Sequence, residues 1–162
     1  MKRTDGLQLF TTNTRGITIC ELMMGLCIIS VLSCIAVPNV IKWLRNEEYR
    51  TSARNIAYML REARSLSVTT NLEHRVEFDS SKKRYRLLQG DRATDSTAWN
   101  AVVYDWRSVP PNVYLDADVE AIHLNPTGTA NAGTIRINDE THRTRCKVVI
   151  ARTGRIRVPA VL

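Results

Sequence analysis

The sequence has too few histidines and cysteines, too widely spread, for a metal centre or a catalytic constellation. Its three histidines, His74, His123 and His142, fall on separate segments. His142 and Cys146 are four residues apart, but in strand-like sequence this spacing supplies two ligands on one face, whereas zinc takes four. We therefore expect no metal, no cofactor and no enzyme active site.

Cysteines are almost absent from the C-terminal two thirds of the chain, where Cys146 stands alone. No disulfide can therefore close within that part. The other three, Cys20, Cys27 and Cys34, recur every seven residues, which places them roughly on one face of a helix. We interpret them as small packing residues, with cross-links between neighbouring subunits as the alternative.

The chain has no internal repeat and no low-complexity tract, and its 162 residues are too few for two full domains and a membrane span. One domain and one anchoring segment are expected. The alternating carboxylates Asp116, Asp118 and Glu120 could suggest a calcium site. Their alternation with apolar residues favours a solvated strand face instead.

Charge is nearly absent from residues 17–37, where Glu21 is the single charged residue in a run long enough to span a bilayer. The preceding segment is polar and basic and ends in Gly16. Residues 31–34 loosely resemble a lipoprotein cleavage box, and residues 34–36 a signal-peptidase site. Both alternatives would leave Glu21 in an apolar signal core, at a cost of about 2.5 to 3.5 kcal/mol. A functional reason for this carboxylate is therefore expected.

Residues 15–22, RGITICEL, resemble the processing site of type IV prepilins and type II secretion pseudopilins. The resemblance implies that a prepilin peptidase cuts between Gly16 and Ile17 and methylates the new N-terminus. It also makes Glu21 the fifth residue of the mature chain, which would pair with the N-terminal amine of a neighbouring subunit and set the register between helices. The family usually has Phe where this chain has Ile17.

The apolar run is followed by Pro38, which removes a helix hydrogen bond and is expected to kink the helix. Apolar residues then recur every three or four positions from Tyr49 to Ser67, which predicts an amphipathic helix. Residues 17–71 as one kinked helix would be about 80 Å long. The expected organisation is a leader at 1–16, a transmembrane helix at 17–37, an amphipathic second half of the helix at 38–71, and a β-rich head at 72–162.

Short segments with strand patterns fill the rest of the chain, and Gly and Pro mark several breaks between them. The first two are predicted to form a hairpin around a turn at 79–82. The sequence predicts an α+β fold in which a long N-terminal helix packs on an antiparallel β-rich head. The expected strands are 73–78, 84–88, 101–106, 113–115, 121–124, 134–137, 146–151 and 155–158.

Three segments of the mature chain are similar to motifs of the GspH/FimT branch of minor pseudopilins. They are the helix segment 53–64, the turn 124–128 (LNPTG) and the terminal segment 153–157 (TGRIR). The resemblance implies a type IV pilin-like fold and a structural subunit of a type II secretion pseudopilus. Its alternative is a FimT-type minor pilin of a type IV pilus.

The resemblance also implies partners and a location. The partners would be the prepilin peptidase, other pilins or pseudopilins, and the membrane through residues 17–37. The protein would cross the bacterial inner membrane once, with its head in the periplasm, before it enters the filament. Basic residues flank the apolar run on both sides, so this orientation comes from the resemblance alone.

The chain is basic, with a formal charge of +7 that falls to +5 when residues 1–16 are removed. In FimT-type proteins the terminal G-R-x-R segment is implicated in holding DNA, so Arg155 and Arg157, with Arg152 beside them, are candidate DNA-binding residues. Contact with phosphates would be salt-sensitive and would not read the sequence. The alternative is a solvated edge strand whose arginines discourage aggregation.

Overall fold

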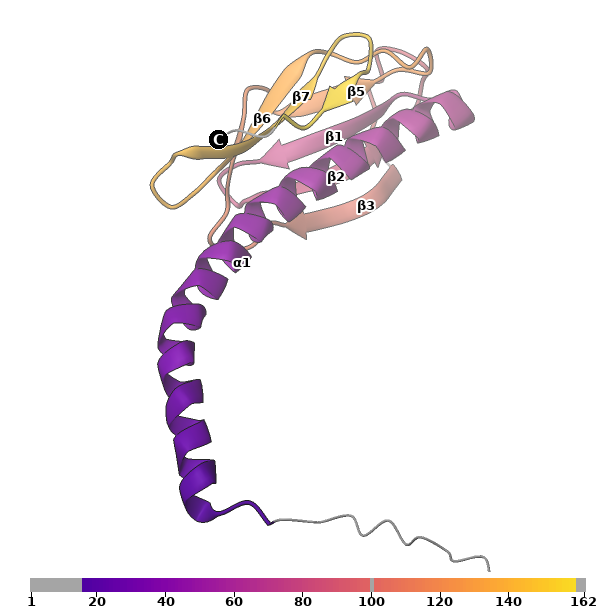
Figure 1. Cartoon of the computed structure of the whole chain (residues 1–162). Helices are drawn as coiled ribbons and strands as arrows, with labels where there is room; N and C mark the ends of the chain where they lie inside the picture. Colours follow the sequence, from indigo (N-terminus) through magenta and orange to yellow (C-terminus); the bar gives the residue numbers. More distant parts are fainter. Residues whose placement is uncertain (1–15, 100, 160–162) are drawn as a thin grey trace, which may run out of the picture. The chain divides into compact units, whose positions relative to one another are not determined.

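The computed structural model describes residues 16–99 and 101–159, so the predicted leader lies outside the described residues apart from Gly16. The chain divides into two compact units, Met1–Ile41 and Lys42–Leu162. Helix α1, Ile19–Thr70, contributes to both units and contains Pro38 (Figure 1). The prediction of one helix through this region is therefore confirmed, with Pro38 inside it, and the kink at Pro38 stays a prediction.

The ends of α1 have recognisable caps. Thr18 precedes the helix, and its Oγ1 accepts a hydrogen bond of 3.2 Å from the backbone nitrogen of Glu21. Thr18 and Glu21 thus occupy the two positions of a capping box, in which threonine at the N-cap is followed three residues later by glutamate. At the other end Asn71, with φ of 55°, adopts the left-handed conformation that often ends a helix.

The second half of α1 buries one face against the strands of its own unit. Ala53, Ile56, Leu60 and Ala63 are completely buried and repeat at the helical spacing of three or four. Two of these four are alanines, whose small side chains allow strands to approach the helix closely. The predicted apolar stripe is confirmed at each of its six positions, Tyr49, Ala53, Ile56, Leu60, Ala63 and Ser67.

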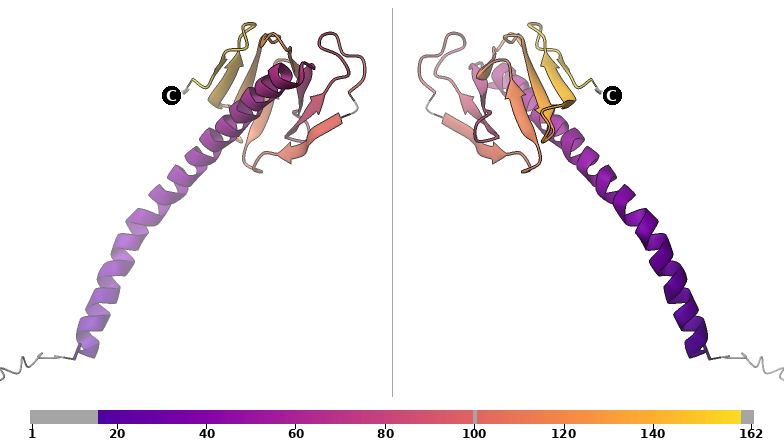
Figure 2. Two further views of the ribbon diagram at one scale, coloured as in Figure 1. Left: turned by 90° about the vertical axis from the view of Figure 1, so that its right-hand side faces the viewer. Right: turned by 90° about the vertical axis from the view of Figure 1, so that its left-hand side faces the viewer.

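Among residues 16–99 and 101–159, eight strands form two antiparallel sheets beside this half of the helix (Figure 2). The first sheet has the order β3-β2-β1-β5 and the second the order β4-β6-β7-β8. All eight predicted strands are present, with ends shifted by at most two residues. They are β1 His74–Asp79, β2 Arg84–Gln89, β3 Ala101–Ser108, β4 Tyr114–Ala117, β5 Ala121–Leu124, β6 Gly133–Asn138, β7 Thr144–Ile150 and β8 Ile156–Arg157.

Both sheets contribute to one hydrophobic core. Val76, Leu87 and Ile122 from the first sheet and Ile135 and Val148 from the second are completely buried. Each buried aliphatic side chain of this size stabilises the fold by about 1.5 to 3 kcal/mol. Every member of the core lies between Tyr49 and Ile150, within the unit Lys42–Leu162.

Two of the carboxylates weighed as metal ligands, Asp116 and Asp118, form salt bridges. The Arg136 guanidinium bonds Asp116 at 3.3 Å and Asp118 at 2.6 Å, which uses these carboxylates in a salt-bridge pair. His142 is exposed on a turn, whereas Cys146 is buried. Within residues 16–99 and 101–159, no three His, Cys, Asp or Glu side chains gather as a metal site would require.

Candidate functional site

The first functional region is the apolar surface of α1 in the unit Met1–Ile41. Every large apolar side chain between Ile17 and Val37 is exposed, and this stretch is long and apolar enough to cross a membrane. Water cannot cover so much apolar surface without cost, because each exposed side chain forgoes about 1.5 to 3 kcal/mol. Lipid tails or the helices of other subunits are the surroundings that suit it.

Three of the four predicted processing and assembly residues lie together at the start of this region, whereas the fourth, Pro38, lies inside α1 just after the apolar run. Gly16 and Ile17 precede the first helical turn and are exposed. Glu21 is also exposed, in the first turn, and no cation of the described residues forms a salt bridge with it. A carboxylate placed this way is free to accept a positive charge from outside the chain.

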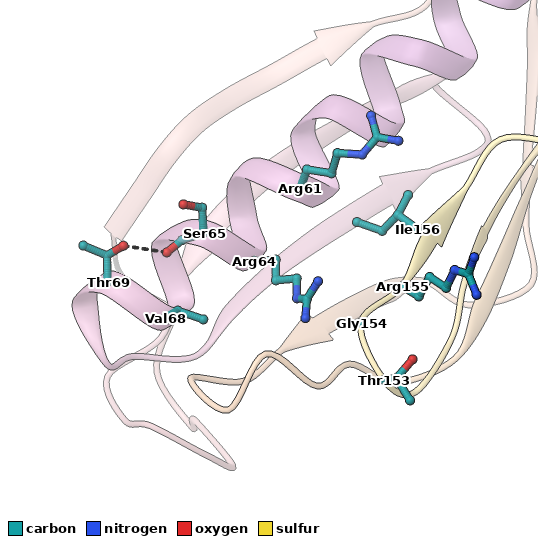
Figure 3. Close-up of a pocket in the computed structure, with 9 residues that line it drawn as sticks. All are labelled: Arg61, Arg64, Ser65, Val68, Thr69, Thr153, Gly154, Arg155 and Ile156. Atoms are coloured by element: carbon teal, nitrogen blue, oxygen red, sulfur yellow. Dashed lines mark hydrogen bonds between the residues drawn. The ribbon is translucent and has the colours of Figure 1, made fainter.

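The second functional region is a cleft of about 680 Å³ between the last turns of α1 and the turn before β8 (Figure 3). We call it the basic cleft because three arginines line it. Arg61 and Arg64 extend from the helix, and Arg155 from the turn at Gly154. The other lining residues are Ser65, Val68, Thr69, Thr153, Gly154 and Ile156.

Arg64, on the helix, contacts two tight turns of the head, one at Gly128 and one at Gly154. Its Nε donates a 3.0 Å hydrogen bond to the carbonyl oxygen of Gly128. Gly128 and Gly154 have φ values of 78° and 71°, in the left-handed region that favours glycine. A Cβ on Gly154 would lie 2.0 Å from the Gly128 carbonyl oxygen and 2.9 Å from Arg64 Nε. The three segments that resemble family motifs therefore meet at one place.

The arginines of the basic cleft have no acidic partner among the residues that the structure describes. Over the described ranges, no salt bridge involves Arg61, Arg64 or Arg155, whereas Arg145 elsewhere in the head bonds Asp139 at 2.8 Å. Guanidinium groups in this state bind phosphate or carboxylate oxygens well. The geometry therefore suits an anionic partner.

The other two predicted DNA-binding residues lie outside the lining of the basic cleft. Arg157 is exposed on β8, where its backbone pairs with Val149 of β7. Arg152 is exposed in the turn before β8. Arg155 and Arg157 flank the half-buried Ile156 and are both exposed, as expected of alternating residues.

Sequence reasoning missed Arg61 and Arg64 as members of this site. Both belong to the polar face of the helix, where a charged residue usually has no partner but water. One feature of the sequence could have indicated Arg64, namely the similarity of Ala63-Arg64 to the helix motif of the family. That similarity did not indicate that Arg64 would reach Gly128, which is 64 positions away in sequence.

Comparison with known proteins identifies relatives of the head. The sequence model of a family described as type II transport protein GspH matches residues 52–154. This span begins in α1 and ends at Gly154, so it includes both turns that contact Arg64. Among curated proteins, none matches this sequence.

Several solved structures have the same fold at low sequence identity. The minor pseudopilin EpsH from the type II secretion system of Vibrio cholerae has a TM-score of 0.58 at 17% identity, over 70% of this chain and 97% of its own. The type IV minor pilin FimU of Pseudomonas aeruginosa has a TM-score of 0.56 at 17% identity, over 72% and 92%. The solution structure of Escherichia coli GspH has a TM-score of 0.56 at 9% identity, over 72% of this chain and 90% of its own. The fold is therefore type IV pilin-like.

Proposed function

We propose, from the premise that this chain belongs to the GspH family of type II transport proteins, that it works as a minor subunit of a secretion pseudopilus. Membership makes the chain a minor pseudopilin, a structural subunit and not an enzyme, which assembles with other pseudopilins. The observation that carries the proposal is a GspH-type head on a helix whose apolar surface is exposed throughout residues 17–37.

Before assembly, α1 anchors the subunit in the inner membrane with the head in the periplasm. The length and apolarity of residues 17–37 support this anchor. A prepilin peptidase removes the leader by cutting between Gly16 and Ile17. The exposure of both residues outside the helix supports this step, since a protease needs extended and accessible chain.

After cleavage, assembly moves the apolar helix from lipid to the centre of a filament of similar helices. Both environments are apolar, so the transfer changes hydrophobic burial little. The charge of Glu21 then distinguishes a correct neighbour from an incorrect one, because an unpaired charge in an apolar interior is strongly unfavourable. The positive partner is the new N-terminal amine at Ile17 of the adjacent subunit.

The mature protein is expected to begin at Ile17 with a methylated amine. Intact-mass spectrometry of the membrane-extracted protein, produced with its prepilin peptidase, measures this directly. A Gly16→Val variant should keep its leader, because the enlarged residue blocks the cleavage position. A mature N-terminus at Cys34 or Val37 would instead indicate a lipoprotein or a secreted protein, and would contradict assembly into a filament.

We propose nucleic-acid binding as a second candidate function, in which the basic cleft holds the phosphates of DNA. The supporting observation is that Arg61, Arg64 and Arg155 line one cleft and form no salt bridge within the described chain. Ser65 and Thr69 add hydroxyl groups on the helix side. Contacts of this kind neutralise phosphates and do not read bases.

Replacing two arginines of the basic cleft is expected to weaken DNA binding and its salt dependence together. If Arg61 and Arg155 each neutralise one phosphate, Arg61→Gln/Arg155→Gln should reduce the slope of log affinity against log salt by about 1.8. The Arg155→Gln/Arg157→Gln variant should lose as much if Arg157 also contacts DNA. Gel shifts with double-stranded DNA at several salt concentrations, using the full chain in detergent, give the slopes.

The matched control removes two arginines that already have acidic partners. Arg84→Gln/Arg136→Gln lowers the net charge equally, but Arg84 bonds Asp79 and Arg136 bonds Asp116 and Asp118. An equal loss in this control would mean general attraction without a site. If Arg61→Gln/Arg155→Gln and Arg155→Gln/Arg157→Gln both bind DNA with wild-type affinity and salt slope, these arginines do not bind DNA. They would then be solvated surface residues, and the chain would be a structural subunit alone.

A further inference from the structure

A second charged cleft lies at the start of the unit Lys42–Leu162, between the first turns of α1 in this unit and the loop that joins β6 to β7. Its volume is about 530 Å³. We call it the membrane-proximal cleft, because its first residue follows the apolar run by only five positions. Its lining residues are Lys42, Arg45, Asn46, Tyr49, Asp139, Glu140, Thr141, Arg143 and Arg145.

Both oxygens of the Asp139 carboxylate accept hydrogen bonds, from its own loop and from Arg145 on β7. Its Oδ1 accepts hydrogen bonds from the hydroxyl of Thr141 at 2.7 Å and from the backbone nitrogens of Thr141 and Arg143. Its Oδ2 accepts a 2.9 Å bond from Arg145 Nε. These bonds hold the pKa of Asp139 well below its usual range, and the bond from the Thr141 hydroxyl has the largest effect. Asp139 therefore stays ionised and neutralises Arg145.

Three basic side chains of the membrane-proximal cleft are left without an acidic partner. In the part of the chain that the structure describes, no salt bridge involves Lys42, Arg45 or Arg143. Glu140, which is exposed, is the remaining carboxylate of the lining. Three positive charges against one negative charge make the cleft attractive to an anion. The phenolic ring of Tyr49 and the amide of Asn46 complete a mixed polar wall.

The position of Lys42 along the chain places it at the level of lipid headgroups. Five helical residues beyond Val37 rise about 7.5 Å. The headgroup region extends roughly 5 to 7 Å beyond the hydrocarbon on each side of a bilayer. Trp43 and Leu44 are 62% and 50% exposed, and tryptophan is enriched at this interface. Lys42 therefore lies at the outer edge of the headgroup region. Arg45 lies about 12 Å beyond Val37, so its long side chain has to extend back toward the membrane to reach a lipid phosphate.

We propose that the membrane-proximal cleft binds the phosphate of an anionic phospholipid headgroup while the subunit waits in the membrane. The proposal rests on the membrane anchoring proposed above. Lys42 and Arg45 reach the phosphate from the helix, and Arg143 reaches it from the β6–β7 loop. A bound headgroup thus ties that loop to the bilayer surface, and the tie is released when the subunit leaves the lipid for the filament.

The test compares headgroups on the full-length chain. Protein in neutral detergent is titrated with short-chain phosphatidylglycerol or phosphatidylcholine, and bound lipid is counted by native mass spectrometry. We expect tighter binding of phosphatidylglycerol. Lys42→Gln/Arg143→Gln should raise its apparent Kd about 30-fold, because each basic residue near an anionic surface contributes about fivefold. The control Arg61→Gln/Arg155→Gln removes equal charge from the basic cleft and should leave the Kd unchanged.

The other results each contradict the proposal in a distinct way. An equal loss in both double variants would mean general attraction and no headgroup site. Inorganic phosphate that binds as tightly as the lipid would identify a free-anion site. Wild-type protein that enters neutral vesicles and resists alkaline extraction, yet does not prefer phosphatidylglycerol, would contradict the headgroup site alone. Failure to enter the vesicles would contradict both this site and the membrane anchor.

Discussion

The Glu21→Gln variant is expected to insert into the membrane normally and to lose its association with other pseudopilins. Insertion should be unchanged or improved, because a carboxylate in a membrane helix costs about 2.5 to 3.5 kcal/mol on insertion scales. Assembly should fail, because the neighbour's N-terminal amine would then be buried without a partner. An uncompensated buried charge costs about 3 to 5 kcal/mol, which weakens association by two orders of magnitude or more.

Glutamine is the informative replacement because Glu21 also has a local role. Thr18 caps α1 through the bond from the Glu21 backbone nitrogen, and at the Glu21 position of a capping box glutamine serves as well as glutamate. Glu21→Gln therefore keeps the cap and removes only the charge. The complementary variant, Thr18→Ala, removes the capping oxygen and keeps the charge.

Co-purification of tagged pseudopilins after mild membrane extraction separates these two roles. We expect Thr18→Ala to co-purify at near wild-type levels and Glu21→Gln to be absent from the complex, with equal amounts of both in the membrane fraction. The reverse pattern would mean that helix capping matters and the charge does not. Normal co-purification of Glu21→Gln would rule out pairing with the neighbour's amine.

Gly154→Ala is expected to lower the stability of the head by about 3 kcal/mol. The left-handed conformation costs alanine about 1 to 2 kcal/mol. The added Cβ would also lie 2.0 Å from the Gly128 carbonyl oxygen, so one of the two turns must move. That movement disturbs the hydrogen bond from Arg64 Nε to the same oxygen. For a head of this size, such a loss lowers Tm by roughly 10 °C.

Thermal unfolding of the full chain in detergent, followed by near-ultraviolet circular dichroism, measures this effect. The matched control is Thr153→Ala, which changes the preceding residue of the same turn. Thr153 is exposed and has an ordinary backbone conformation, so its Tm should change little. A Gly154→Ala variant as stable as this control would mean that the contact between the two turns is not tight in solution.

The elements of the fold could be predicted from the sequence because their signals are local. Spacing of three or four between Tyr49 and Ser67 identified the buried helix face, and Pro38 did not end the helix. Strand-like segments bounded by turn residues identified each strand to within two residues at its ends. Gly16, Ile17 and Glu21 lie within six positions of one another, so their arrangement depended on short-range order alone. Whether these three act as proposed remains a prediction.

The two clefts were decided by the tertiary structure. Arg64 and Gly128 are far apart in sequence, and Gly128 meets Gly154 only because the strand order of the two sheets brings their turns together. The membrane-proximal cleft likewise joins Lys42 to Arg143, about a hundred positions along the chain. Periodicity tells which side of its own element a residue occupies. It does not tell which distant element covers that side, since this depends on how the whole chain packs its apolar faces into one core.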